Sequence, residues 1–208
     1  MGFSTLIDIL GSTLIGGMLL LILLRLNDSG VQNTYMYGGE LIVQQNLVDA
    51  VKLLEYDFRK IGFCADWKKL PDPLKYIVYA DSNKIKFLTD VDSDGNVDTM
   101  TYFTGPTSEL LNTPNPRDML LYRVVNGATP RGSNLGVTEF NLVYYDNFGN
   151  ILPCPVASPS LIEKMQINIR VEDVYGYDTD NINKNNSEMY ANAFWRQIRL
   201  VARNLRNR

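Results

Sequence analysis

The chain contains no histidine, and this absence excludes several classes of site. Without histidine there can be no Ser-His or Cys-His nucleophile pair, no histidine general base and no zinc site with a histidine ligand. Two cysteines are too few for a four-cysteine metal site, and the glycine-rich phosphate-binding motifs are missing. An enzyme would have to work with carboxylates alone, and no pair of them stands out. We therefore expect that the protein is not an enzyme.

The chain also has little net charge, and one long segment near the N-terminus has no charged residue at all. The formal net charge of the 208 residues is only −3, which gives no reason to expect a nucleic-acid partner. Residues 9–24 carry no charge, and no proline precedes Pro71. As a helix, residues 6–26 (LIDILGSTLIGGMLLLILLRL) would cover roughly 32 Å, enough for a hydrocarbon core of about 30 Å. Residues 1–30 are therefore predicted to form a membrane-spanning helix.

The helix is predicted to continue as an amphipathic segment over residues 31–62. Apolar residues recur there with 4-3-4-3 spacing, which places them on one helical face: Leu47, Val51, Leu54, Phe58 and Ile61. Glu55 and Arg59 are four residues apart and can pair on the opposite, solvent-exposed face. Gly62 is the type of residue that commonly follows a helix end. Residues 63–208 then form a separate head domain.

The apolar segment could also be a cleavable secretory signal or a permanent membrane anchor. A cleavable secretory signal has basic residues before a shorter apolar run and a small-residue cleavage site after it, and residues 1–30 show neither. A permanent single-pass anchor fits the same residues and stays open as an alternative. Arg25, on the far side of the span, opposes an outward-facing head under the positive-inside rule.

The head domain is predicted to be rich in β-structure. Alternating or β-branched runs predict strands over residues 76–80, 84–89, 119–125 and 165–171, and a strand-turn-strand over 136–153. Residues 175–191 form a polar loop, interpreted either as a contact surface or as a solvated excursion. At the C-terminus, the spacing of Phe194, Ile198, Val201 and Leu205 is that of an amphipathic helix, with arginines on its other side.

An acidic stretch between two predicted strands has most of the pattern of a calcium-binding loop. Asp90, Asp92 and Asp94 alternate, Gly95 follows, and Asn96 and Asp98 continue the alternation. Alternate carboxylates in a tight turn converge on one point, and calcium needs six to eight oxygen ligands. Position twelve of the pattern is Thr101 instead of the bidentate glutamate. A solvated β-hairpin turn is the alternative, because Asp and Gly are also turn formers. Calcium is the one cofactor that the sequence suggests.

The two cysteines, Cys64 and Cys154, allow two interpretations. Each could be an inert buried thiol, which is common for an isolated cysteine. If the head lies outside the cytoplasm, they could instead form a disulfide. The sequence leaves both possibilities open.

The first ten residues, MGFSTLIDIL, resemble the start of type IV pilins and type II secretion pseudopilins. In that family Gly-Phe-Thr-Leu-Ile-Glu-Leu marks the prepilin peptidase site and opens a long helix. Here Gly2-Phe3, then residues 5–7, then residues 8–10 match these pieces in order, with Ser4 as an additional residue and Asp8 in place of the glutamate. The basic leader of the family is missing before Gly2. Residues 53–63, LLEYDFRKIGF, and the acidic hairpin also resemble J-type minor pseudopilins and W-type minor pilins.

The resemblance implies an α+β fold, in which a long N-terminal helix, membrane-spanning in its first half, packs on an antiparallel sheet of about five to seven strands. It also implies cleavage between Gly2 and Phe3 with methylation of the new amine, and a C-terminal strand ending in Arg203-Asn204. Asp8 would pair with the N-terminal amine of a neighbouring subunit; the alternative is that Asp8 caps its own helix at the membrane boundary.

The function implied is that of a structural subunit in a type IV pilus or a protein-transporting pseudopilus. Its partners would be other pilin-like subunits and an inner-membrane assembly machine, and its head would be extracytoplasmic on a single-pass inner-membrane helix. The alternative function is a membrane-anchored extracytoplasmic binding module that does not assemble.

Overall fold

The computed structural model describes residues 2–70, 72–176, 190 and 192–200. The one α-helix among them is α1 (Gly2–Arg59). The strands are β1 (Ile77–Ala80), β2 (Lys84–Thr89), β3 (Asp98–Thr104), β4 (Met119–Val125), β5 (Arg131–Tyr145), β6 (Ile151–Leu152), β7 (Lys164–Glu172) and β8 (Asn192–Leu200). Short 3-10 helices cover Trp67–Lys69, Pro73–Lys75, Thr107–Leu110 and Pro159–Leu161. The chain divides into two compact units, Met1–Gly39 and Glu40–Arg208, so α1 contributes residues to both.

In the first unit, residues 6–26 of α1 present apolar side chains on all sides of the helix. The large apolar side chains between residues 6 and 26 are each more than half exposed. The hydroxyls of Ser12 and Thr13 donate to the backbone carbonyls of Ile9 and Leu10, which satisfies these polar groups within the helix. By length and composition the helix can cross a membrane. This agrees with the predicted span.

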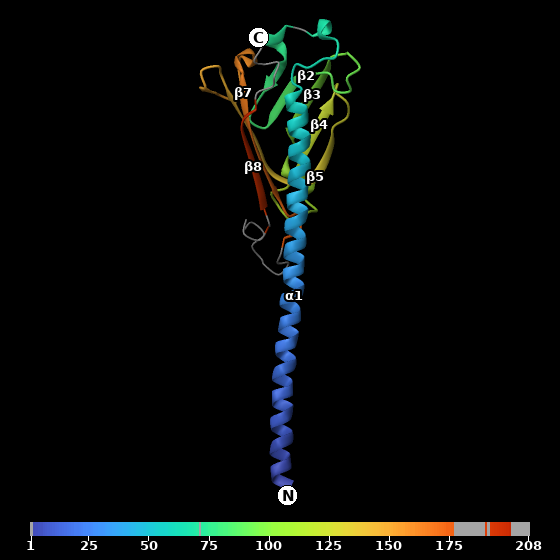
Figure 1. The fold of residues 1–208 in the computed structure, drawn as a ribbon, viewed down its shortest axis with the longest axis vertical. Helices are drawn as coiled ribbons and strands as arrows, with labels where there is room; N and C mark the ends of the chain where they lie inside the picture. The colour runs from blue at the N-terminus through green and yellow to red at the C-terminus, as the bar shows by residue number, and fades with distance from the viewer. Residues whose placement is uncertain (1, 71, 177–189, 191, 201–208) are drawn as a thin grey trace. The chain divides into compact units, whose positions relative to one another are not determined.

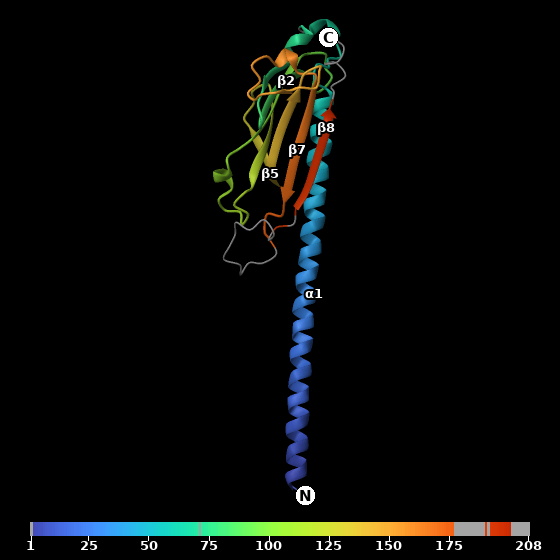
Figure 2. The same ribbon diagram turned by 90° about the vertical axis from the view of Figure 1, so that its left-hand side faces the viewer.

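In the second unit, the end of α1 packs on the sheet through the face that the spacing predicted. Leu54, Phe58 and Ile61 are buried, and Leu47 and Val51 pack against them. The Phe58 ring meets the rings of two strand residues edge to face, with centroids 5.6 Å from Phe87 and 5.4 Å from Tyr102. Figures 1 and 2 show this part of α1 along one face of the sheet. Val43 and Ala50 extend the buried stripe beyond the predicted set.

The sheet is antiparallel and eight-stranded, in the order β1-β2-β3-β4-β5-β7-β8, with β6 paired to β5. Its clearest alternation is in β7, where Met165, Ile167, Ile169 and Val171 are all 0% exposed. Strand β5 begins at Arg131, earlier than predicted, and β6 has only two residues. A helix packed on an antiparallel sheet confirms the α+β, pilin-like layout.

The turn after α1 fixes the helix end against strand β2. Gly62 has a φ of +70°, which favours glycine, and its N–H donates to the Leu88 carbonyl (2.8 Å). A Cβ at this position would collide with the ring of Tyr76. The helix ends at Arg59, close to the predicted end, because the last turn tightens before Gly62.

The C-terminal segment is a strand, as the resemblance implies, and the helix predicted from apolar spacing is wrong. Strand β8 pairs antiparallel with β7, with Trp195 opposite Ile169 and Phe194 opposite Arg170. The physical reason is that β7 offers a free edge, and backbone hydrogen bonds to this edge override a local 3.6-residue pattern. Arg203 and Asn204 lie outside the described residues, as does most of the polar loop 175–191.

Candidate functional site

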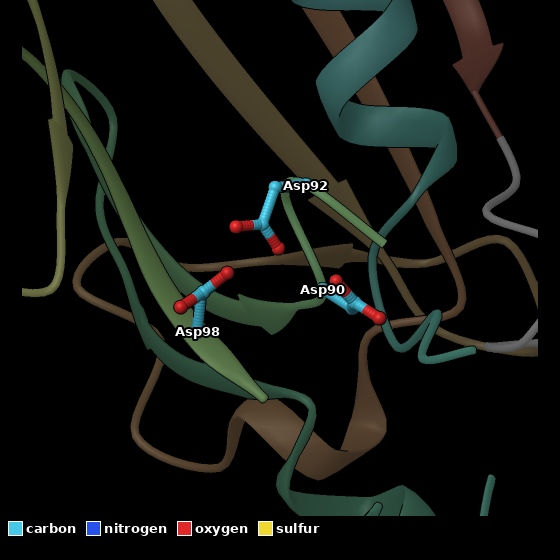
Figure 3. Close-up of side chains that lie close together, drawn as sticks. All are labelled: Asp90, Asp92 and Asp98. Atoms are coloured by element: carbon cyan, nitrogen blue, oxygen red, sulfur yellow. The ribbon is translucent and has the colours of Figure 1, made fainter. Parts of the chain in front are cut away.

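Three acidic side chains come together in the connection between β2 and β3. One carboxylate oxygen from each of Asp90, Asp92 and Asp98 lies within 4.8 Å of the other two (Figure 3). Asp90 directly follows β2, and Asp98 opens β3, where it is the register partner of Thr89. The hairpin register therefore brings the first and last of these carboxylates together, and the turn brings in Asp92.

Asp90 is the innermost member of this three-carboxylate cluster and is 0% exposed. Its Oδ2 accepts hydrogen bonds from the N–H groups of Ala65 and Gly95, both at 3.0 Å. Its Oδ1 is buried and has no hydrogen-bond partner among the residues that the structure describes. The Ala65 N–H, helped by the Gly95 N–H, lowers the pKa of Asp90 against the opposing effect of burial. The carboxylate is therefore ionised at neutral pH.

Asp98 and Asp92, the other two members of the cluster, accept hydrogen bonds from residues that do not belong to it. Asp98 accepts from the Val91 N–H (3.0 Å) and from Asn126 Nδ2 (2.6 Å). Asp92 is exposed and accepts from the Asp94 N–H (3.2 Å). None of the ion pairs among the described residues involves the three carboxylates.

The remaining two residues of the predicted calcium set do not join the cluster. Asp94 instead accepts from the backbone N–H and the Nδ2 of Asn96, both at 2.7 Å. The Asn96 side chain is the main cause that lowers the pKa of Asp94. Asn96 Oδ1 accepts from Lys69 Nζ (2.8 Å). The structure thus brings together three of the five predicted residues, and the other two bond to each other.

The predicted processing and assembly residues lie in the first turns of α1. Gly2 is its first residue, and Phe3 is 81% exposed. Asp8 is exposed between two exposed isoleucines, Ile7 and Ile9. It is the only acidic residue between Gly2 and Arg25, so a carboxylate stands alone in an apolar helix surface.

A buried ionic contact, which the sequence analysis did not identify, joins α1 to the sheet. Asp57 is 2% exposed and accepts from the Tyr102 hydroxyl and from Arg123 Nε (2.6 Å) and Nη2 (3.3 Å). Tyr102 and Arg123 are register partners on β3 and β4. The bond to Asp57 raises the pKa of Arg123, and burial raises that of Tyr102. The sequence signal was available, because Asp57 falls on the apolar face of the helix between Leu54 and Phe58.

Two further buried acidic residues, Glu172 and Asp118, lie where the 114–118 loop meets the end of β7. Glu172 accepts from Arg117 Nη2 (2.7 Å) and from Asn115 Nδ2 (3.1 Å). Asp118 is 1% exposed, and neither of its carboxylate oxygens has a hydrogen-bond partner. The Thr113 hydroxyl faces it but donates to the Leu110 carbonyl (2.7 Å). Burial raises the pKa of Asp118 to about 7.

Of the two interpretations that the sequence left open for the cysteines, the structure shows the one without a disulfide. Cys64 and Cys154 are both free thiols in the structure. Cys64 is buried in the turn after α1, whereas Cys154 is exposed as a residue. Partial desolvation of the Cys154 thiol raises its pKa, and the charge of nearby Asp81 raises it further. The two thiols belong to different parts of the head, so the interpretation as separate thiols is the one that fits.

The geometry thus offers an exposed apolar helix carrying Asp8, a three-carboxylate cluster and a buried ionic contact between helix and sheet. The apolar helix is a surface for lipid or for other helices, and the carboxylate cluster could bind a metal ion. The contact of Asp57 with the sheet holds the end of α1 in the head. Comparisons with protein-family models, curated proteins and solved structures find no match. These features are therefore the basis for the function proposed below.

Proposed function

We propose that the chain is a pilin-like structural subunit of a type IV pilus or of a type II secretion pseudopilus, and that it assembles through its N-terminal helix. The observation that carries this proposal is the uniform exposure of apolar side chains over residues 6–26 in a helix whose other end belongs to the core of an α+β head. An apolar surface of this size is unfavourable in water and requires a covering.

In a subunit of this kind, the apolar helix surface is covered by lipid before assembly and by other subunits after it. Before assembly, lipid covers the helix, which is long and apolar enough for a single inner-membrane span. After assembly, the equivalent helices of neighbouring subunits cover it. The head is then extracytoplasmic, and the partners are other pilin-like subunits and an inner-membrane assembly machine. Cleavage between Gly2 and Phe3, with methylation of the new amine, would prepare the helix for this transfer.

Asp8 gives the helix surface a specific partner. A carboxylate that is surrounded by apolar helices is costly unless an opposite charge pairs with it. The N-terminal amine freed by cleavage on a neighbouring chain is the simplest such charge. One pair per subunit would fix the axial register of the assembly, which apolar contacts alone define poorly.

The test compares Asp8→Ala with Asp28→Ala, a matched removal of an exposed acid from the same helix but beyond the apolar segment. Each variant is expressed in the native cell, and its amount is measured in isolated assemblies and in the membrane fraction. Asp8→Ala strands the partner amine, at a cost of roughly 3–5 kcal/mol if both groups are buried. At 1.4 kcal/mol per tenfold, this weakens assembly by at least about 100-fold.

We expect Asp8→Ala to be lost from assemblies at an unchanged membrane level, because removing a charge from a span favours insertion. Asp28→Ala should behave as wild type in both fractions. If Asp8→Ala assembles as well as Asp28→Ala does, the register role is wrong. If wild type is found in membranes only, the chain is a permanent anchor and the proposal is wrong.

A further inference from the structure

We propose that Asp90, Asp92 and Asp98 form a calcium site that fixes the β2–β3 connection to the end of α1. This inference concerns the head alone and does not depend on whether the subunit assembles. It starts from two independent observations, the convergence of the three carboxylates and the unpartnered oxygen of Asp90.

The first observation is the concentration of negative charge. Oxygens of three carboxylates lie within 4.8 Å of one another, and no Lys or Arg forms an ion pair with them among the described residues. Like charges at such distances repel, more strongly where part of the group is withdrawn from water. A divalent cation between the carboxylates turns this repulsion into attraction.

The second observation is the state of Asp90. Its Oδ2 accepts hydrogen bonds from the Ala65 and Gly95 N–H groups. Its Oδ1 is buried, and no group in the described part of the chain forms a hydrogen bond with it. A buried carboxylate oxygen that bonds to neither protein nor water costs free energy. Figure 3 shows the carboxylates of Asp92 and Asp98 facing each other beside Asp90. A cation held between the three would supply the partner that Asp90 Oδ1 lacks.

The donor set selects the type of cation. All three groups are carboxylates, hard oxygen ligands that suit calcium and magnesium rather than soft metals. Calcium accepts six to eight oxygens in irregular arrangements, and the exposed Asp92 leaves room for water ligands. Magnesium requires near-octahedral geometry and gives up its water reluctantly, so calcium is the better fit.

The same geometry indicates how tightly the site should bind calcium. The twelfth position of the calcium-loop pattern, Thr101, lies in β3 opposite Lys86 and supplies no bidentate carboxylate. Asp94 and Asn96, moreover, bond to each other. We therefore expect a dissociation constant of roughly 10 μM to 1 mM, the range of weaker sensor sites and extracellular modules.

Calcium at this site would act on the turn after the helix as well as on the loop. The Ala65 N–H donates to Asp90, the Asp90 N–H donates to the Phe63 carbonyl (2.8 Å), and Lys60 Nζ donates to the Val91 carbonyl (3.0 Å). Fixing the Asp90 carboxylate thereby fixes the segment that links α1 to β2. Binding should consequently stabilise the folded head.

The experiment uses the full chain in detergent, stripped with a chelator and kept at about 0.15 M NaCl so that ionic strength stays constant. Calcium chloride binding is measured by isothermal titration calorimetry, and its effect on folding by the melting temperature. The test variant is Asp92→Asn, because Asp92 is exposed and the amide oxygen can still accept from the Asp94 N–H. The control is Asp146→Asn, which removes a carboxylate from another turn, where it accepts from the N–H and Nδ2 of Asn150.

We expect wild type and Asp146→Asn to bind one calcium ion per chain and to melt at a higher temperature when calcium is added. Without calcium, Asp92→Asn should melt at the wild-type temperature or above it, because the variant relieves part of the repulsion between the carboxylates. Its calcium affinity should be at least about tenfold lower, because one of three anionic ligands is lost. Magnesium should bind more weakly than calcium. The proposal is overturned if wild type shows neither heat nor a melting shift up to about 5 mM calcium, above the expected dissociation range. Calcium binding that is unchanged in Asp92→Asn, or magnesium binding as tight as calcium, would also overturn it.

Discussion

Replacing Asp57 with alanine is expected to weaken the contact between helix and sheet more than any other single change of a charged group on α1. Asp57 is buried, and it receives hydrogen bonds from both Tyr102 and Arg123. The alanine variant leaves a partly buried guanidinium and a buried hydroxyl without their acceptor. No other charged residue of α1 is both buried and bonded to two strands.

The magnitude follows from how far each abandoned group can reach water. Breaking a buried ion pair by removing one partner costs about 3–5 kcal/mol. The Arg123 side chain is 30% exposed and can be partly rehydrated, whereas Tyr102 is 0% exposed and cannot. We therefore expect the lower end, about 3 kcal/mol, which for a chain of this size lowers the melting temperature by roughly 6–12 °C.

The assay is thermal or urea unfolding of the full chain in detergent, with Glu55→Ala as the control. Glu55 lies on the same helix and pairs with Arg59 at 3.9 Å, but the Arg59 side chain is 61% exposed. Its loss should cost no more than about 0.5 kcal/mol. A double-mutant cycle of Asp57→Ala with Arg123→Ala should give a coupling of at least about 1 kcal/mol. An Asp57→Ala variant as stable as Glu55→Ala, or a cycle without coupling, would refute the reasoning.

Three further predictions test other parts of the head. Gly62→Ala should cost at least about 2 kcal/mol in unfolding experiments, because it adds a clash with Tyr76 to the strain of a positive φ. Gly127→Ala, at a φ of +68° in open space, should cost less, and equal costs would count against the clash. Because the pKa of Asp118 is raised to about 7 in the folded state, the contribution of Asp118 to wild-type stability should fall as pH rises from about 4 to 7. Asp118→Asn should remove this fall, so its advantage should grow by up to about 1.4 kcal/mol per pH unit, and a pH-independent difference would be contrary to the prediction. Deleting residues 1–30 should leave a soluble, folded head, because the buried stripe of α1 begins only at Val43; an aggregated product would show that the head needs these residues.

Local pattern was sufficient for much of the fold. The spacing of Leu47, Leu54 and Phe58 predicted which face of α1 is buried, because a helix repeats its faces every three to four residues. Alternation predicted β7 in the same way. In the acidic hairpin, the alternation predicted a cluster that included Asp90, Asp92 and Asp98, and the structure brings these three together. Asp94 and Asn96 were predicted to join them and do not, because they bond to each other.

Contacts that depend on distant parts of the chain were beyond the sequence pattern. The apolar spacing of residues 194–205 is helical, yet the segment 192–200 is a strand because the edge of β7 is free to pair with it. A buried Asp57 signalled the need for a partner, but Arg123 could be named only once β3 and β4 were in register. The pairing of Cys64 and Cys154 stayed open for the same reason, since spacing along the chain says nothing about where the two thiols lie in the head.

The central claim is that this helix is processed and transferred into an assembly. The measurement that tests it most directly is mass spectrometry of the N-terminus, performed on protein from native membranes and from isolated assemblies. Processing after Gly2 predicts that the assembled chain starts at Phe3, with a methylated amine. Assembled chains that retain Met1 and Gly2, or a protein found uncleaved in membranes and absent from assemblies, would contradict the account.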